Sequence, residues 1–198
     1  MLKMRKGCSV PFPEKLSEGW QDQQFGFVAN VDADKIESLL EHFIQLHEEP
    51  MFFVLELPSK QEDETEIRPG VVNALHKDVY YIDGCTQQET LAILNRTAKL
   101  MINDGLCSFG VGFHLSHDEI MVGKYNVISV YTRNKDAFDG FFEKHGIGFS
   151  ENLITAWDTF TQDAPGESFR VDTNGRSIYD LPELLRDFGI YLAERREA

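Results

Sequence analysis

Hydrophobic residues along this chain follow two spacings, the alternation of a strand and the three-to-four-residue repeat of a helix. Short runs rich in Phe, Val, Ile and Tyr predict buried strands, and they lie at residues 25–31, 51–57, 78–84, 107–114 and 125–132. The run 107–114 alternates. Cys107 and the large apolar side chains share one face of it, and the other face carries Ser108, Gly110, Gly112 and His114.

Helices are predicted where apolar residues recur at i, i+3, i+4 and i+7 behind a capping residue. Asp34 and Glu37 have the spacing of a capping box before one such repeat, and Thr86 and Glu89 have it before another. Asn134 is the expected cap of a third helix, which is predicted to carry Phe138, Phe141 and Phe142. Each of these helices would place one apolar face on the predicted strands.

The two ends of the chain are laid out differently. Residues 1–22 contain two prolines and show no clear period, so they are expected to form an irregular N-terminal arm. Residues 151–198 are predicted to form a helix–hairpin–helix segment. Its hairpin rests on Asn174 and Gly175, because both central residues of such a turn need positive φ.

The helices on either side of that hairpin are predicted from their apolar residues. The first helix would turn the side chains of Leu153, Ile154 and Trp157 towards the core. The last would open with Asp180 and Glu183 as a capping box and bury a stripe formed by Leu181, Leu184, Leu185, Phe188 and Leu192. Gly189 lowers helix propensity within this stripe, so the helix could end there.

The order of these elements predicts a single α+β domain over residues 1–198. We expect a mixed or antiparallel sheet with helices packed on it, followed by the C-terminal hairpin and helix. A hydrophobic content of 42% is enough for a sizeable core. The charged stretch 58–70, bounded by prolines, is predicted to be a loop between sheet elements.

Charge narrows the range of partners. The net charge is −14, and it is spread evenly: residues 1–99 hold 10 Lys and Arg against 17 Asp and Glu, and residues 100–198 hold 9 against 16. Such a surface repels nucleic-acid phosphates and anionic lipid headgroups, so neither is expected as a partner. It attracts a basic protein and speeds that encounter.

The location of the protein is predicted from what its sequence does not contain. The first residues include basic side chains but no apolar stretch of the kind found in secretory signals, and no run approaches the length of a membrane span. Cys8, Cys85 and Cys107 are odd in number and widely spaced, which favours reduced thiols in the cytoplasm. Cys107 is expected to behave as a small buried hydrophobe.

The most concentrated candidate chemistry lies in the stretch after the strand 107–114. His114, His117, Asp118 and Glu119 are residue types that bind metals or transfer protons. Their spacing differs from the helical H-E-x-x-H motif, and no nucleotide-binding loop or nucleophile elbow accompanies them. We therefore predict no bound metal and no cofactor. A metal- or acid–base-dependent enzyme that uses this cluster is the alternative function.

Two further features suggest binding surfaces. Ser108, Gly110 and Gly112 leave one face of their strand nearly bare, and glycine in a strand marks a bulge or the close approach of another group. That group could be a helix, a ligand or a partner chain. Trp157 precedes an acidic Pro-Gly loop, where it could be an exposed protein-binding anchor or a core residue.

The blocks YNVISVYTRNKDAFDGFFEKHGI and ITAWDTFTQDAPGESFRVDTNGRSIYDLPELLRDFGIYLAERRE cover about residues 125–196. They resemble small acidic bacterial cytoplasmic proteins, of the kind found as immunity partners of polymorphic toxins. The resemblance implies a non-enzymatic acidic binding protein that neutralises a basic toxin. No site residue is transferred from it.

Overall fold

One large antiparallel sheet organises the chain. The computed structural model describes residues 1–48, 50–58, 65–68, 71–73 and 76–197. The strands of this sheet are β2 (Gly19–Gln23), β3 (Gly26–Asn30), β4 (Met51–Pro58), β7 (His76–Cys85), β8 (Ser108–Phe113), β9 (Glu119–Val122), β10 (Val127–Tyr131) and β12 (Tyr191–Glu197). Their order across the sheet is β12-β7-β4-β8-β9-β10-β3-β2, and each neighbouring pair is antiparallel. The predicted α+β class with an antiparallel sheet is confirmed.

Two small two-stranded sheets lie outside this large one. β1 (Cys8–Ser9) pairs with β11 (Glu167–Ser168), and β5 (Thr65–Arg68) pairs with β6 (Val71–Asn73). Much of the loop predicted at 58–70 lies outside the described residues, but its described part includes β5.

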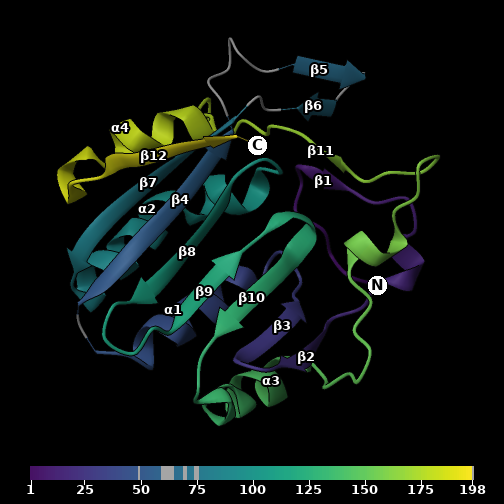
Figure 1. Ribbon diagram of the computed structural model, residues 1–198, viewed down its shortest axis with the longest axis horizontal. Helices are drawn as coiled ribbons and strands as arrows, with labels where there is room; N and C mark the ends of the chain where they lie inside the picture. Colours follow the sequence, from purple (N-terminus) through teal and green to yellow (C-terminus); the bar gives the residue numbers. More distant parts are fainter. Residues whose placement is uncertain (49, 59–64, 69–70, 74–75, 198) are drawn as a thin grey trace.

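Helices cover one side of the large sheet. The α-helices are α1 (Ile36–Gln45), α2 (Gln87–Asn103), α3 (Asp139–His145) and α4 (Leu181–Leu184). Short 3₁₀ helices are η1 (Pro13–Lys15), η3 (Lys124–Asn126), η4 (Lys135–Phe138), η5 (Ala156–Thr159), η6 (Ile178–Asp180) and η7 (Arg186–Phe188). In Figure 1, α1 and α2 lie behind the sheet, and no helix lies over the side of β8, β9 and β10 that is turned to the viewer. Within the described part of the chain, no helix is long and apolar enough to cross a membrane.

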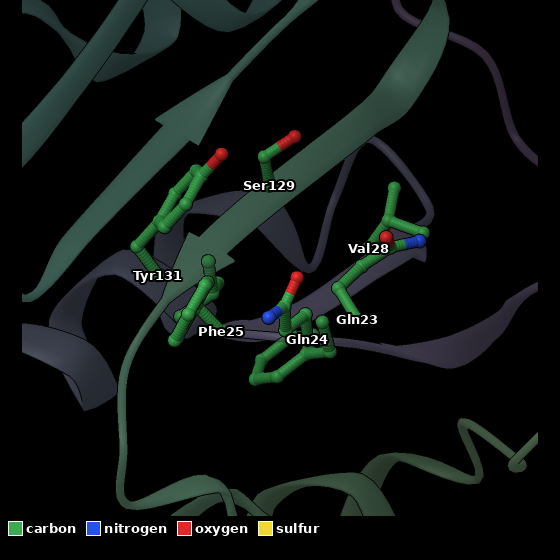
Figure 2. Close-up of a pocket in the computed structure, with 8 residues that line it drawn as sticks. Gln23, Gln24, Phe25, Val28, Ser129 and Tyr131 are labelled. Carbon is green, nitrogen blue, oxygen red and sulfur yellow. The ribbon is translucent and has the colours of Figure 1, made fainter.

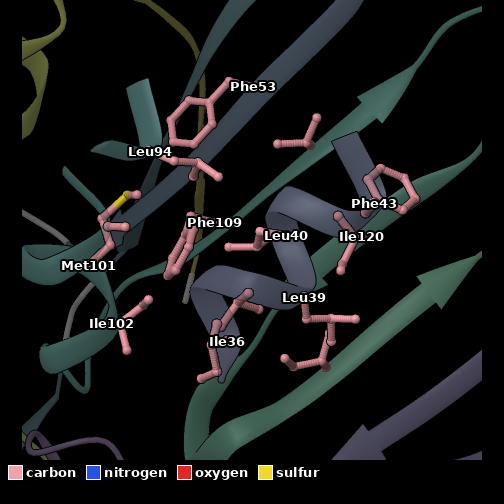
Figure 3. Packing of buried hydrophobic residues seen from close by; sticks show 14 of the residues in the cluster. Ile36, Leu39, Leu40, Phe43, Phe53, Leu94, Met101, Ile102, Phe109 and Ile120 are labelled. Carbon is pink, nitrogen blue, oxygen red and sulfur yellow. The ribbon is translucent and has the colours of Figure 1, made fainter. Parts of the chain in front are cut away.

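The core fills the space between these helices and the sheet (Figure 3). Ile36, Leu39, Leu40 and Phe43 form the inner stripe of α1 and are fully buried. They pack with side chains of α2 and of the strands, among them Leu94, Met101, Phe53, Phe109 and Ile120. The predicted alternation of 107–114 is confirmed, because its apolar face is buried at Cys107, Phe109, Val111 and Phe113.

Of the four predicted helix caps, only Thr86 makes the expected side-chain hydrogen bonds, and Asn134 precedes the 3₁₀ helix η4 without a capping bond from its side chain. Thr86 caps α2, and its side chain and that of Glu89 exchange hydrogen bonds with each other's backbone N–H groups. Before α1, the Asp34 carboxylate instead accepts a hydrogen bond from Lys3 Nζ at 2.8 Å. Before the last helix, Asp180 closes an earlier capping box with Ser177, since these two have the same spacing one turn upstream.

The N-terminal arm is shorter and more ordered than predicted. Residues 19–23 form β2, so the irregular part ends before that strand. Arg5 anchors the arm: its side chain is buried, and its guanidinium donates to the carbonyl groups of Met101, Ile102, Asp104, Cys107 and Gly123. This arginine fastens the arm to the end of α2 and the start of β8. The hydrophobic periodicity of the sequence does not reveal this role of Arg5, because its hydrogen-bond partners are backbone groups far away in sequence.

The turn of the predicted C-terminal hairpin is present, but a single isolated bridge replaces its paired strands, and the flanking helices are corrected. Asn174 and Gly175 both have positive φ, at 54° and 74°, in a turn closed by a Thr173–Arg176 bridge. The last α-helix, α4, ends already at Leu184, and Gly189 instead ends the following 3₁₀ turn η7 with φ 80°. Leu192 therefore belongs to β12 and is 48% exposed, so its predicted place in a helix stripe is wrong.

The helix predicted before the hairpin is also different. Only the 3₁₀ turn η5 forms there, with Ala156 buried in it. Ile154 and Trp157 are 49% and 54% exposed, so the prediction that they point inward is wrong. A single 3₁₀ turn is too short to present the apolar stripe that helical spacing implied.

Candidate functional site: the open face of the sheet

We call the side of the sheet without helices the open face. It is made by the strand residues that alternate with those of the helix-covered core, and the strand register places them in rows across the sheet. Val54, Gly110 and Gly112 on this face are themselves buried. Its members are Val28, Phe52, Val54, Glu56, Tyr81, Ser108, Gly110, Gly112, Glu119, Met121, Ser129 and Tyr131.

The glycines of β8 let neighbouring side chains lie flat on this face. Gly112 pairs with Phe52, and a Cβ atom on Gly112 would lie 2.3 Å from the tip of the Phe52 ring. A Cβ atom on Gly110 would lie 2.4 Å from the sulfur of Met121 and 2.2 Å from the Ile120 carbonyl oxygen. The groups that approach these glycines are thus side chains and backbone of the adjacent strands. The register of β8 with both neighbours is regular, so no bulge lies there.

Two carboxylates lie on the open face towards opposite ends of β8, because Glu56 pairs with Ser108 and Glu119 pairs with Gly112. Glu56 lies beside two cations, at 3.4 Å from Lys77 Nζ and 3.5 Å from Arg196 Nη1. Glu119 is half-buried and, among the described residues, has no cationic side chain within ion-pair distance. Burial raises the pKa of Glu119, and the charge of Glu56 raises it further. The pKa of Tyr81 is raised mainly by burial and then by Glu119.

His114 lies at the rim of the open face, as its place at the end of the strand predicts. Its ring is exposed, packs against Phe52 with centroids 4.8 Å apart, and places Nε2 3.2 Å from Asp83 Oδ1. The Tyr191 hydroxyl donates to the other oxygen of Asp83. Imidazole, carboxylate and phenol are thus linked in one exposed hydrogen-bonded group.

The rest of the histidine–carboxylate cluster points elsewhere. Asp118 Oδ2 accepts from His47 Nε2 at 2.7 Å and from the Thr132 hydroxyl at 3.2 Å. His47 Nδ1 lies 2.8 Å from the Phe43 carbonyl oxygen. Both ring nitrogens of His47 therefore face oxygen atoms of other residues. This pair ties the end of α1 to the turn between β8 and β9.

The predicted cluster therefore divides among three places. His114 joins Asp83, Asp118 joins His47, and Glu119 lies on the open face. His117 is exposed in the turn with φ 61°. Across the described residues, no three His, Cys, Asp or Glu side chains gather as metal ligands would. This geometry gives the alternative enzyme function no common reaction centre at residues 114–119.

The three cysteines are buried thiols. Burial raises the pKa of Cys107 to about 12 and that of Cys85 to about 11. It also raises the pKa of Cys8. A thiol with a raised pKa is a poor nucleophile because little of it is ionised at neutral pH. Cys107 is a small buried hydrophobe, as its place in the alternation predicted.

Trp157 is an exposed aromatic residue on a separate part of the molecule. It packs edge-on against Tyr125, with ring centroids 4.9 Å apart, and against Phe160. Tyr125 and Phe160 belong to a small second hydrophobic cluster with Leu2, Cys8, Leu16 and Ala156. Of the two interpretations of Trp157 from the sequence, the structure agrees with the exposed one.

A hollow at one end of the open face was not predicted (Figure 2). It has a volume of about 430 Å³ and is lined by Gln23, Gln24, Phe25, Val28, Ser129 and Tyr131. We call it the Gly26 hollow, because Gly26 pairs with both Gln23 and Tyr131 and places no side chain between them. Phe25 and Tyr131 are 58% and 59% exposed at its walls. The only sequence signal was a phenylalanine beside a glycine in a polar stretch.

Comparison with known proteins finds no family model, no curated protein and no solved structure that matches this chain.

Proposed function

We propose that this protein is an acidic binding protein that holds a basic protein partner on the open face. Neutralisation of a basic toxin by an immunity-type protein is the form of this function that the resemblance at residues 125–196 implies. The observation that carries the proposal is a sheet face without helices over it that bears Glu119, a carboxylate with no ion-pair partner among the described residues.

The chemistry of the open face supports this function. Tyrosine, methionine and phenylalanine are enriched in protein–protein interfaces, where they supply large apolar contact areas. The open face presents Phe52, Tyr81, Met121 and Tyr131 on strands that are held rigidly by their neighbours. A rigid face loses little conformational entropy on binding, so more of the contact energy appears as affinity.

Charge supports the choice of a basic partner. Glu56 already has two cationic neighbours, whereas the carboxylate of Glu119 has none in the part of the chain that the structure describes and could pair with a cation from another molecule. Removing water from an unpaired carboxylate is costly, and an incoming arginine or lysine would offset that cost. The net charge of −14 would also steer such a partner at long range.

The test compares two charge reversals. The protein and its Glu119→Arg and Glu41→Arg variants are immobilised, and basic proteins are captured from a lysate of the source organism. Glu41 is a matched control because it lies on α1, on the helix-covered side of the sheet. We expect Glu119→Arg to lose the captured basic protein and Glu41→Arg to retain it.

Two results would contradict the proposal. One is the absence of any basic protein among those captured by the unaltered chain. The other is equal capture by all three proteins, since it would show that contact is made elsewhere. Circular dichroism and thermal melting of both variants check that the fold survives each charge reversal.

A further inference from the structure

The Gly26 hollow is a consequence of how β2, β3 and β10 meet. Gly26 has φ +126°, and a Cβ atom there would lie 1.8 Å from the Val130 carbonyl oxygen. Only glycine fits at this contact, because every other residue would collide with the backbone of β10. In the strand register, Gly26 lies between Tyr131 and Gln23. Because glycine has no side chain, the surface of the sheet is hollow between these two residues.

The walls of the hollow combine aromatic rings with hydrogen-bond acceptors. Phe25 and Tyr131 each expose more than half of their surface, which is a large apolar area. Among the described residues, neither ring packs against another aromatic ring. Gln23, Gln24 and Ser129 add amide and hydroxyl groups around them (Figure 2). Aromatic faces and acceptors together suit a cation whose charge is spread over a flat group.

The charges around the hollow are compatible with such a cation. Glu119 is the direct cross-strand neighbour of Tyr131, and directly opposed residues place their Cβ atoms about 5 Å apart. Lys135 is a cation near the hollow, and its ammonium group is held by the Asp22 carboxylate at 2.9 Å and the Gln23 carbonyl at 2.9 Å. The pair is neutral as a whole, and Glu119 adds a negative charge on the side of Tyr131 away from Gly26.

We propose that the Gly26 hollow binds an arginine side chain of the basic partner. The guanidinium lies against the rings of Phe25 and Tyr131, its N–H groups donate to the amide and hydroxyl oxygens of the lining, and Glu119 attracts its charge from the other side of Tyr131. This inference rests on the proposed function, and it names the chemical group that the open face recognises. Lysine fits less well, because its compact ammonium is strongly hydrated and cannot stack on a ring face.

The experiment uses three short peptides as probes. Acetyl-Gly-Arg-Gly-amide, its citrulline counterpart and its norleucine counterpart are titrated into the ¹⁵N-labelled full chain. Citrulline keeps the shape of arginine without its charge, and norleucine tests a purely apolar occupant. We expect the arginine peptide to shift the amide resonances of Phe25, Gly26, Ser129 and Tyr131, and to bind more tightly than the other two.

Two variants show whether the binding uses the named groups. Tyr131→Ala should weaken the arginine peptide about two- to fivefold, which is the size of one exposed cation–π contact. Glu119→Gln should weaken it as well and should reduce the preference over citrulline. Tyr191→Ala is the matched control, because Tyr191 is an exposed tyrosine in β12, at the far edge of the sheet. It should leave the affinity unchanged.

The inference is overturned if citrulline or norleucine peptide binds as tightly as arginine, or if the shifted resonances lie away from the hollow. Its failure is separable from failure of the proposed function. A chain that captures a basic protein through Glu119 but ignores the arginine peptide retains the function and loses the arginine assignment. A chain that binds the arginine peptide in the hollow but captures no basic protein retains the arginine assignment and loses the proposed function.

Discussion

Glu119 occupies a place where a carboxylate does not help the fold. Burial and the nearby charge of Glu56 both favour its protonated form, which is why its pKa is raised. A residue whose ionised form is disfavoured in the folded state lowers stability once it is ionised. A neutral residue at this position would fold more easily, so the carboxylate is better explained by a binding role.

Replacing Glu119 with glutamine should therefore raise the melting temperature at neutral pH. A group whose pKa is raised by folding contributes to stability below its pKa in the unfolded chain, about 4.3 for glutamate. That contribution to the free energy of unfolding is lost as the pH rises through the pKa of the group in the folded chain. The difference between the variant and the unaltered chain should thus be largest at pH 7 and shrink towards pH 4. Thermal melts at the two pH values measure it.

The exposed Glu151→Gln substitution serves as the control for this pH series, since Glu151 lies on the surface. It should shift the melting temperature little at either pH. A lower melting temperature for Glu119→Gln at pH 7 would show that the Glu119 carboxylate stabilises the fold, and the binding explanation would then lose its support.

At the level of single residues, the sequence predicted which face of the sheet a side chain occupies better than it predicted which other side chains it contacts. The alternation of 107–114 assigned each side chain of β8 to the correct side of the sheet. It could not show that Phe52 and Met121 fill the space above the glycines, because they come from β4 and β9 and their positions depend on strand register. For the same reason it could not show that Asp118 meets His47.

At the level of elements, β8 lies at the centre of the sheet and is shaped by its glycines. Phe52 and Met121 lie across it because Gly112 and Gly110 leave room for them. Two aromatic or apolar side chains lying flat keep this part of the open face smooth. An alanine at either position would force its neighbour to move.

A double-mutant cycle tests this packing. Gly112→Ala should cost about 1–3 kcal/mol in the unaltered chain, because the new methyl group overlaps the Phe52 ring. In a Phe52→Ala background the same change should cost close to nothing, since the overlapping ring is gone. Urea unfolding of the four proteins gives the coupling energy.

Gly148→Ala is the matched control for this cycle, because nothing lies within 4 Å of a Cβ atom there. It should have the same small effect in both backgrounds. Equal costs for Gly112→Ala with and without Phe52 would show that the two residues are not coupled, against the packing described for the open face.

The elements that the sequence missed are those with polar or mixed patterns. β9 begins with the acidic end of a turn, β2 is mostly polar, and β12 carries four charged residues, so none showed clear alternation. Both β2 and β12 are at the edges of the sheet. Charged side chains on an edge strand discourage pairing with another chain, which explains why these strands look unlike the central ones.

At the level of the whole molecule, the two sides of the sheet have different roles. Two helices close one side and bury the core against it (Figure 1). The other side leaves aromatic and acidic side chains uncovered on a chain with a net charge of −14. The composition predicted the sign of the surface charge, but only the strand order shows which surface is available for binding.

The most direct test of this account is the association rate of the captured basic partner, measured by stopped flow across a range of ionic strength. Electrostatic steering predicts a rate that falls at least about tenfold as salt screens the charges, and a shallower fall for Glu119→Gln. An association rate that stays constant with ionic strength would contradict the claim that the acidic open face draws in its partner.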